Sequence, residues 1–223
     1  MDFSAVLLDL DGTLLDTIPD LAHAANAMRA EFSLPALSQA LIATYVGKGS
    51  EHLVRRTLAN NPAGTAPDAG TIQHGLAIFG RHYARVNGDQ AVLYPGALDG
   101  LRAFRDAGLA MAVVTNKPTE FTLPLLDRFN IAQYFSHVVC GDTCPRKKPD
   151  PMPLLHACTL LGVSPGQALA IGDSLNDAQA ARAAGITVLA VPYGYNEGMD
   201  VRTLAVDDIV TSIAEAARWA ARH

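Results

Sequence analysis

The chain has 223 residues, of which 49% are hydrophobic, so it is long enough and apolar enough to bury a sizeable core. Its net charge of −5 and its pI of about 5.7 argue against a nucleic-acid partner, because such a partner requires a basic surface. No apolar run approaches the roughly 20 residues needed to cross a bilayer, and the first residues lack a secretory pattern, so we expect no membrane partner and no export.

The first expected element is a buried strand at residues 5–8, an apolar run that ends in a tight turn at residues 9–12. From Thr17 to about Gly88 the pattern changes to apolar residues at helical spacing, interrupted by prolines and glycines. Because no strand pattern interrupts this segment, it predicts an all-helical block.

After residue 96, short apolar runs alternate with helical patterns of about 10–15 residues. We expect strands at residues 110–114, 138–139, 168–171 and 187–191, and helices near 98–107, 118–129, 154–161, 178–184 and 211–221. This alternation predicts a parallel sheet covered by helices on both faces. The fold class is therefore α/β. We expect a Rossmann-like core at residues 1–16 and 89–223 and an inserted all-helical domain at residues 17–88.

Polar residues gather where the predicted strands end, which is where ligands bind in an open parallel sheet. They are Asp9 and Asp11 after the first strand, Thr115 and Asn116 after the second, Lys148 beyond the third, and Asp173 and Asp177 after the fourth. Carboxylates suit a hard cation such as Mg²⁺. A lysine, a hydroxyl and backbone amides suit the oxygens of a phosphoryl group. The set therefore predicts a site for a divalent cation and a phosphate.

Four short segments stand in order at these predicted strand ends. They are Asp9-Leu10-Asp11-Gly12-Thr13-Leu14, Thr115-Asn116-Lys117-Pro118, Lys148-Pro149 and Gly172-Asp173-Ser174-Leu175-Asn176-Asp177. Together they resemble the four motifs of the haloacid dehalogenase superfamily of phosphatases. The helical block after the first segment resembles the helical cap of that superfamily. The resemblance covers nearly the whole chain and implies a Mg²⁺-dependent phosphatase.

The resemblance also implies roles for the residues that react with or hold the phosphoryl group. Asp9 would be the nucleophile that accepts the phosphoryl group. Asp11 would first protonate the leaving oxygen and then act as the base that activates water. Thr115 and Lys148 would hold the phosphoryl oxygens.

The remaining implied roles concern the metal and the surrounding loops. Mg²⁺ would be bound by Asp9, by Asp173 and by the backbone carbonyl of Asp11. Asp177 would bind the ion directly or would contact the residues that bind it. Thr13 and Asn116 are expected to contact the phosphate or substrate, Thr13 through the loop of the first motif.

One segment of the helical block, Tyr45-Val46-Gly47-Lys48-Gly49-Ser50, places two glycines around a lysine at a break between helices. Glycine permits close approach and backbone-amide contacts, and lysine supplies a mobile positive charge. Lys48 and Gly49 are therefore predicted to bind an anionic group of the substrate, such as a carboxylate. The alternative is a plain turn between helices with an exposed lysine.

This segment, the second motif and Tyr193-Gly194-Tyr195-Asn196 resemble the phosphoglycolate phosphatases within the superfamily. The implied substrate is 2-phosphoglycolate, a small phosphorylated metabolite. Related phosphatases of sugar phosphates, including N-acetylmuramate 6-phosphate, share the core motifs and remain an alternative. We expect a monomer or a homodimer.

Other classes fit the residues less well. A phosphomutase of the same fold usually differs at the position of Asn176-Asp177. Asp11 argues against Schiff-base chemistry on a phosphonate aldehyde, because the relative with that chemistry lacks an aspartate at this position. A signalling receiver domain is shorter and lacks a helical cap. A catalytically silent binding protein would not need the complete set of nucleophile, acid, metal ligands and lysine. Multiple turnover would separate an enzyme from the last two.

The chain has three cysteines, Cys140, Cys144 and Cys158, an odd and sparse set that is typical of reduced thiols. Cys140 and Cys144 are close in sequence, but no further Cys or His stands at the spacing of a metal site. We therefore expect a cytoplasmic protein whose cysteines and seven histidines carry none of this chemistry.

Overall fold

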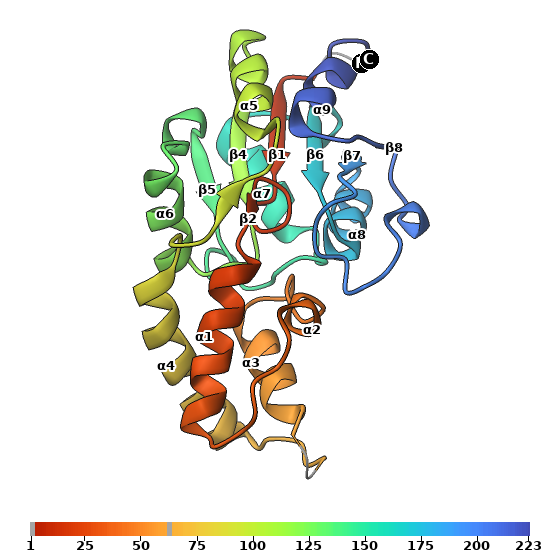
Figure 1. Cartoon of the computed structure of the whole chain (residues 1–223). Helices are drawn as coiled ribbons and strands as arrows, with labels where there is room; N and C mark the ends of the chain where they lie inside the picture. The colour runs from red at the N-terminus through yellow and green to blue at the C-terminus, as the bar shows by residue number, and fades with distance from the viewer. Residues whose placement is uncertain (1–2, 62–63) are drawn as a thin grey trace.

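The computed structural model describes residues 3–61 and 64–223. Residues 1–2, the predicted start of the core, and residues 62–63, within the predicted helical block, lie outside the described residues. In Figure 1 a sheet with its flanking helices occupies the upper part of the molecule, and a group of helices occupies the lower part.

The sheet has six strands in the order β5-β4-β1-β6-β7-β8. Their bounds are β1 (Ala5–Leu8), β4 (Ala110–Val114), β5 (His137–Val139), β6 (Ala168–Gly172), β7 (Thr187–Ala190) and β8 (Asp208–Ile209). All neighbouring pairs are parallel, which confirms the predicted α/β class. The chain runs from β1 to β4 on one side and later returns to β6 on the other. The strand order therefore reverses at β1, where ligands bind in such sheets.

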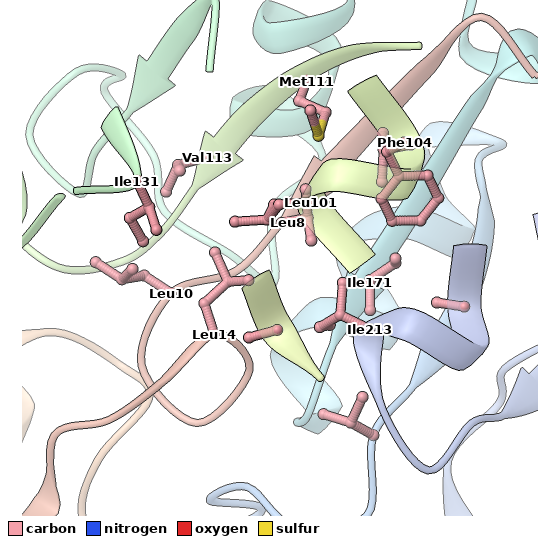
Figure 2. Close-up of a cluster of buried hydrophobic side chains, with 14 of the residues drawn as sticks. Leu8, Leu10, Leu14, Leu101, Phe104, Met111, Val113, Ile131, Ile171 and Ile213 are labelled. Atoms are coloured by element: carbon pink, nitrogen blue, oxygen red, sulfur yellow. The ribbon is translucent and has the colours of Figure 1, made fainter. Parts of the chain in front are cut away.

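Helices cover both faces of the sheet, as predicted. One face carries α5 (Ala97–Asp106), α6 (Thr119–Arg128) and α9 (Ile213–Ala220), and the other carries α7 (Met152–Leu161) and α8 (Leu175–Ala184). Successive side chains of a strand point to opposite faces. Leu8 of β1 therefore joins Leu101 and Phe104 of α5 in the cluster of Figure 2, whereas Leu7 packs on the other face. Single-turn 3₁₀ helices occupy Ala132–Tyr134, Pro165–Gln167 and Val201–Thr203.

The helical group consists of α1 (Ile18–Glu31), α2 (Gln39–Ala43), α3 (Ser50–Ala59) and α4 (Ala69–Val86). It has a hydrophobic cluster of its own, in which Met28, Val54 and Phe79 are buried. Among the helices described in the structure, none has the length and apolar character needed to cross a membrane.

The chain enters and leaves the helical group through a two-stranded antiparallel ribbon. The strands are β2 (Leu15–Asp16) and β3 (Val92–Leu93). The sequence did not predict this ribbon or β8, because two residues are too few to show an alternating pattern. The ribbon fixes the two ends of the helical group next to each other at the edge of the core.

A buried carboxylate anchors the linker that returns to the core. Asp20, in the first turn of α1, is fully buried and accepts hydrogen bonds from the backbone N–H groups of Gly88 (2.9 Å), Gln90 (2.9 Å) and Ala91 (3.1 Å). The amides of Gly88 and Ala91 are buried, so without Asp20 they would be unpaired at a position with little access to water. Asp20 therefore ties the start of α1 to the end of the helical segment.

Replacing Asp20 by alanine is expected to lower the free energy of unfolding by about 2–4 kcal/mol, because buried donors lose their acceptor. Urea denaturation measures the change. Asp99→Ala on α5 is the matched control, since the Asp99 side chain is 75% exposed. Equal small losses in both variants would contradict the anchoring role.

Candidate active site

Three carboxylates converge at the carboxyl ends of β1 and β6. Asp9 follows β1, Asp173 follows β6, and Asp177 lies in the first turn of α8. One ligand oxygen from each lies within 4.8 Å of the others, so the three can hold one metal ion. Oδ2 of Asp177 accepts bonds from the N–H and hydroxyl of Ser174, which fixes this side chain at the start of α8.

Asp173 is held by two donors and by two glycines that leave room for it. Thr13 Oγ1 donates to Oδ1 at 3.0 Å, and the backbone N–H of Tyr195 donates to Oδ2. A Cβ atom at Gly12 or Gly194 would lie 2.4 or 2.3 Å from Oδ2. A larger residue at position 12 or 194 would therefore collide with the Asp173 carboxylate.

Thr13, which was predicted to contact the phosphate or substrate through the loop of the first motif, directs its hydroxyl to Asp173. Its side chain is fully buried, and its hydroxyl is taken up by Asp173. Its backbone carbonyl accepts a bond from the Tyr193 hydroxyl at 3.0 Å. Thr13 therefore positions the carboxylate of Asp173.

Lys148 joins the acidic cluster, where the sequence predicted it. Its Nζ lies 2.9 Å from Asp9 Oδ1 and 2.6 Å from Asp177 Oδ1, and it donates to the carbonyl of Val114 at 2.6 Å. Only 5% of the side chain is exposed. Burial alone would lower the pKa of Lys148, but the carboxylates of Asp177 and Asp9 raise it above its ordinary value. The ammonium group is therefore a permanent charge of the site.

The carboxylates outnumber this lysine, and the pKa values of two of them, Asp9 and Asp173, are raised. Burial raises the pKa of Asp9 to about 7, although Lys148 opposes the change. Burial and the charges of Asp177 and Asp9 also raise the pKa of Asp173 well above its ordinary value. A divalent cation would supply the missing positive charge, so the chemistry of this donor set fits Mg²⁺.

Asp11 stands apart from the acidic cluster. Both of its carboxylate oxygens lie 3.1 Å from Lys117 Nζ, and Thr17 Oγ1 donates to it at 2.7 Å. The side chain is 14% exposed and lines the pocket described below. This position suits an acid that reaches the leaving group while its side chain stays away from the metal ligands.

Asn116 lines the pocket, where a contact to phosphate or substrate was predicted, and its side-chain amide already has protein partners. It donates to the carbonyls of Gly47 and Lys148, both at 2.9 Å, and accepts the N–H of Lys148 at 2.9 Å. It therefore holds the Lys148 loop and one loop of the helical group. Thr115 is buried beside it and lines the pocket, as expected for a phosphate contact.

A small cavity of about 40 Å³ lies between the sheet and the helical group. Core and helical residues contribute to its wall: Asp9, Asp11, Thr115, Asn116 and Lys117 from the core, and Leu21, Val46, Gly47, Gly49, Ser50, Leu53 and Tyr83 from the helices. The predicted residue Gly49 is thus part of the wall. Its φ of +86° is a conformation that glycine adopts readily and other residues rarely adopt.

In the part of the chain that the structure describes, Lys48 does not line this cavity. Its side chain is 40% exposed and forms an ion pair with Glu197 of the core. The predicted cap lysine therefore links the helical group to the loop after β7, instead of facing the acid Asp11. The structure gives it the position of an exposed lysine at a turn.

Sequence reasoning missed Lys117 and Tyr83 as pocket residues. Lys117 lies within the second motif, but nothing in the pattern separated it from a solvated loop lysine. Tyr83 belongs to the helical apolar stripe of α4, which predicts a core position. Its hydroxyl accepts a bond from Lys117 Nζ at 2.6 Å, which places both residues beside Asp11.

The chain matches the family model of haloacid dehalogenase-like hydrolases over residues 6–191. It is 50% identical over 218 residues to a phosphoglycolate phosphatase of Nitrosospira multiformis, covering 98% of this chain and 96% of that protein. It is 48% identical over 217 residues to a phosphoglycolate phosphatase of Thiobacillus denitrificans, covering 97% and 95%. The crystal structure of a predicted phosphoglycolate phosphatase from Haemophilus somnus is 33% identical, with a TM-score of 0.93 over 98% of both chains. The similarity extends over the sheet and the helical group together.

Proposed function

The chain belongs to the haloacid dehalogenase-like hydrolase family and is a phosphoric monoester hydrolase, and from this premise we propose that its substrate is 2-phosphoglycolate and its cofactor Mg²⁺. One observation carries the proposal. Asp9 lies among Lys148, Asp173 and Asp177 on one side and opens into a small pocket that holds Asp11 on the other.

In the first step a carboxylate oxygen of Asp9 attacks phosphorus, and the bond from phosphorus to the leaving oxygen breaks. Asp11 gives its proton to that oxygen, so glycolate departs as an alcohol. Lys148 and Thr115 hold the phosphoryl oxygens, and Asp9 carries the phosphoryl group as an aspartyl-phosphate.

In the second step Asp11, now a carboxylate, takes a proton from water. The water oxygen attacks phosphorus, and the bond from phosphorus to Asp9 breaks. Inorganic phosphate leaves, Asp9 returns as a carboxylate and Asp11 holds its proton again. The Lys117 and Thr17 contacts to Asp11 keep the same carboxyl group in place for both steps.

The carboxylates of Asp9, Asp173 and Asp177, with the backbone carbonyl of Asp11, would hold the Mg²⁺ ion. When bound, the ion would screen the charge between the phosphoryl group and the attacking carboxylate. Thr13 and the Tyr195 amide would keep Asp173 directed at that position.

The size of the pocket favours a small leaving group. A volume of about 40 Å³ is room for about three water molecules, since each needs roughly 10–15 Å³, and the phosphoryl group held by Thr115 also enters this space. Glycolate fits that space better than an amino sugar does. A sugar phosphate is therefore the second candidate and a phosphomutase reaction a more distant one.

We assign residues 17–88 as a cap that opens to admit substrate and closes to exclude water. Two observations support this division. Helices α1 to α4 have their own hydrophobic cluster, and both linkers to the core lie together at the β2–β3 ribbon. The pocket is lined from both sides, so opening of the cap would expose Asp9 and Asp11 to solvent.

Mg²⁺ is expected to raise Tm, and to raise it more at about pH 8 than at about pH 5.5. The pKa of Asp9 rises from 3.8 to about 7 on folding, because burial disfavours its charge. Between these values the metal-free native state holds a proton that the unfolded chain lacks, so the contribution of Asp9 to stability falls as pH rises. Bound Mg²⁺ must displace that proton, so acid weakens its effect.

Thermal unfolding with Mg²⁺ and with EDTA at both pH values measures this effect, and Asp173→Asn should remove most of the Mg²⁺-dependent shift. A shift of equal size at both pH values in the unmodified protein would contradict the assignment of these carboxylates as ligands.

Phosphate release from a panel of esters tests the proposed function. The panel holds 2-phosphoglycolate, hexose and amino-sugar phosphates, pyrophosphate and an aryl phosphate, each with Mg²⁺ and with EDTA. We expect the highest kcat/KM on 2-phosphoglycolate and its loss with EDTA. A maximum on a sugar phosphate would discard this substrate, and activity unchanged by EDTA would discard the metal.

A further inference from the structure

We propose that Lys117, together with the hydroxyl of Tyr83, binds the carboxylate of the leaving group and so determines specificity for an acidic substrate. The inference rests on the proposed function, because it names the residues that would recognise the substrate of that reaction. It transfers the role predicted for Lys48 to a lysine of the core.

Lys117 is held in the wall of the pocket with its charge facing inward. Its side chain is 3% exposed, and its Nζ contacts Asp11 at 3.1 Å and the Tyr83 hydroxyl at 2.6 Å. The ammonium group also lies 4.6 Å from the centre of the Tyr83 ring. Because core and helical contacts both fix this lysine, it is preorganised for a ligand.

The charges of the residues that line the cavity make Lys117 the cation for a second anionic group. Of the described residues in the wall, Lys117 carries the one positive charge. Lys148 is shared between Asp9 and Asp177 and belongs to the phosphate end of the site. Lys48 is paired with Glu197 outside the pocket.

The position of Lys117 matches the shape of 2-phosphoglycolate. In this molecule only a methylene carbon separates the leaving oxygen from the carboxylate. The group that protonates the leaving oxygen therefore lies close to the group that binds the carboxylate. Asp11 and Lys117 are neighbours at 3.1 Å. Asp11 engages the ammonium group with both oxygens, and a substrate carboxylate can take over one of these two contacts.

Tyr83 supplies a second donor to the same anion. Its oxygen accepts the bond from Lys117, and among the described residues no acceptor takes its hydroxyl proton. Burial, together with the charges of Asp11 and Asp20, raises the pKa of Tyr83 well above its ordinary value, so the proton stays on the hydroxyl. Because Tyr83 belongs to α4 and Lys117 to the core, one substrate carboxylate would contact both parts and favour the closed cap.

The N-terminus of α3 borders the same cavity and adds to its positive potential. Gly49 and Ser50 line the wall at the start of this helix of 10 residues. Helix N-termini favour anions, because their first N–H groups lack partners within the helix. This part of the wall is thus suited to a negative group at the distal end of a short substrate.

The test compares kcat/KM for 2-phosphoglycolate and ethyl phosphate, which lacks the carboxylate, in the unmodified enzyme and in variants. Lys117→Met is expected to lose at least about 100-fold more on 2-phosphoglycolate than on ethyl phosphate. Tyr83→Phe keeps the ring against Phe79 and Phe121 and should lose about 10-fold selectively. If Lys117→Met does not fold, the Tyr83→Phe variant provides the test by itself. Lys48→Met is the matched control and should change both esters by a similar small factor.

The possible outcomes distinguish a failure of the inference from a failure of the proposed function. Equal losses on both esters in Lys117→Met or in a folded Tyr83→Phe would overturn the inference, because these residues would then serve Asp11 or the packing alone. A selective loss in Lys48→Met would overturn it in favour of the exposed lysine. Failure of the proposed substrate would appear in the unmodified enzyme, as no preference for 2-phosphoglycolate over ethyl phosphate, and would remove the basis of the inference as well.

Discussion

Replacing Asp9 by asparagine is expected to lower kcat/KM by at least about four orders of magnitude on every ester, because the amide cannot form the acyl phosphate. The protein should remain folded. Burial already disfavours the charge of Asp9 and raises its pKa to about 7, so a neutral side chain of the same shape removes a repulsive charge from the cluster. We expect Tm without Mg²⁺ to be unchanged or higher.

The control for Asp9→Asn is Asp127→Asn, which makes the same chemical change at an exposed position of α6. Steady-state phosphate release and thermal unfolding of both variants give the two readouts. Appreciable multiple turnover by Asp9→Asn, with contamination by another phosphatase excluded, would remove Asp9 from the role of nucleophile.

Replacing Lys148 by methionine is expected to lower kcat/KM by about three orders of magnitude and the free energy of unfolding by about 3 kcal/mol. The lysine is the cation shared by Asp9 and Asp177, at 2.9 and 2.6 Å. Without it the phosphoryl oxygens lose a charged donor, and the two carboxylates lose their counter-charge in a buried place. Mg²⁺ should restore part of the lost stability, because it also neutralises this cluster.

Its neighbour in the chain provides the control. Lys147 is exposed, although its Nζ lies near Gly49 of the pocket wall, so Lys147→Met should leave stability close to that of the unmodified protein and lower activity far less than Lys148→Met does. Chemical denaturation with and without Mg²⁺ and kcat/KM measurements compare the two variants. If both lysines gave the same small effects, the assignment of Lys148 to the site would be wrong.

Much of this arrangement could be predicted from sequence because of one geometric rule. The carboxyl ends of parallel strands meet at one edge of a sheet, so a polar residue directly after a buried run is placed by the fold itself. This rule alone predicts that Asp9, Thr115 and Asp173 lie close together. Asp177 followed from the spacing of one helical turn. Lys148 lies in a loop, and only the resemblance to a family motif singled it out.

The residues that the sequence did not reveal depend on side-chain direction, which spacing alone does not give. Lys117 and Lys48 are both loop lysines next to glycine- or proline-containing turns, yet Lys117 points into the pocket and Lys48 to Glu197. Tyr83 has the periodicity of a core residue and is buried like one, but its hydroxyl reaches Lys117. Periodicity identifies the buried face of a helix and does not reveal a polar atom at its edge.

Two predicted substrate contacts, Thr13 and Asn116, have side chains with protein partners that the sequence did not reveal. Thr13 and Asn116 belong to the family motifs, and both lie next to the site, but their polar atoms are taken up by Asp173 and by the loops around Lys148. A motif reports that a side chain is needed without reporting which partner it needs. Their contribution is to hold the reacting groups in position, which the atomic contacts alone reveal.

Trapping the phosphoryl group on the protein tests the central role of Asp9 most directly. The enzyme, in excess over 2-phosphoglycolate with Mg²⁺, would be quenched within the first turnover and reduced with borohydride, which converts an aspartyl-phosphate to homoserine. Peptide mass spectrometry then locates the reduced residue. We predict homoserine at position 9, its absence without substrate and its absence in Asp9→Asn. Phosphate released at full rate with no reduction at position 9, or reduction at another carboxylate, would contradict the central role of Asp9.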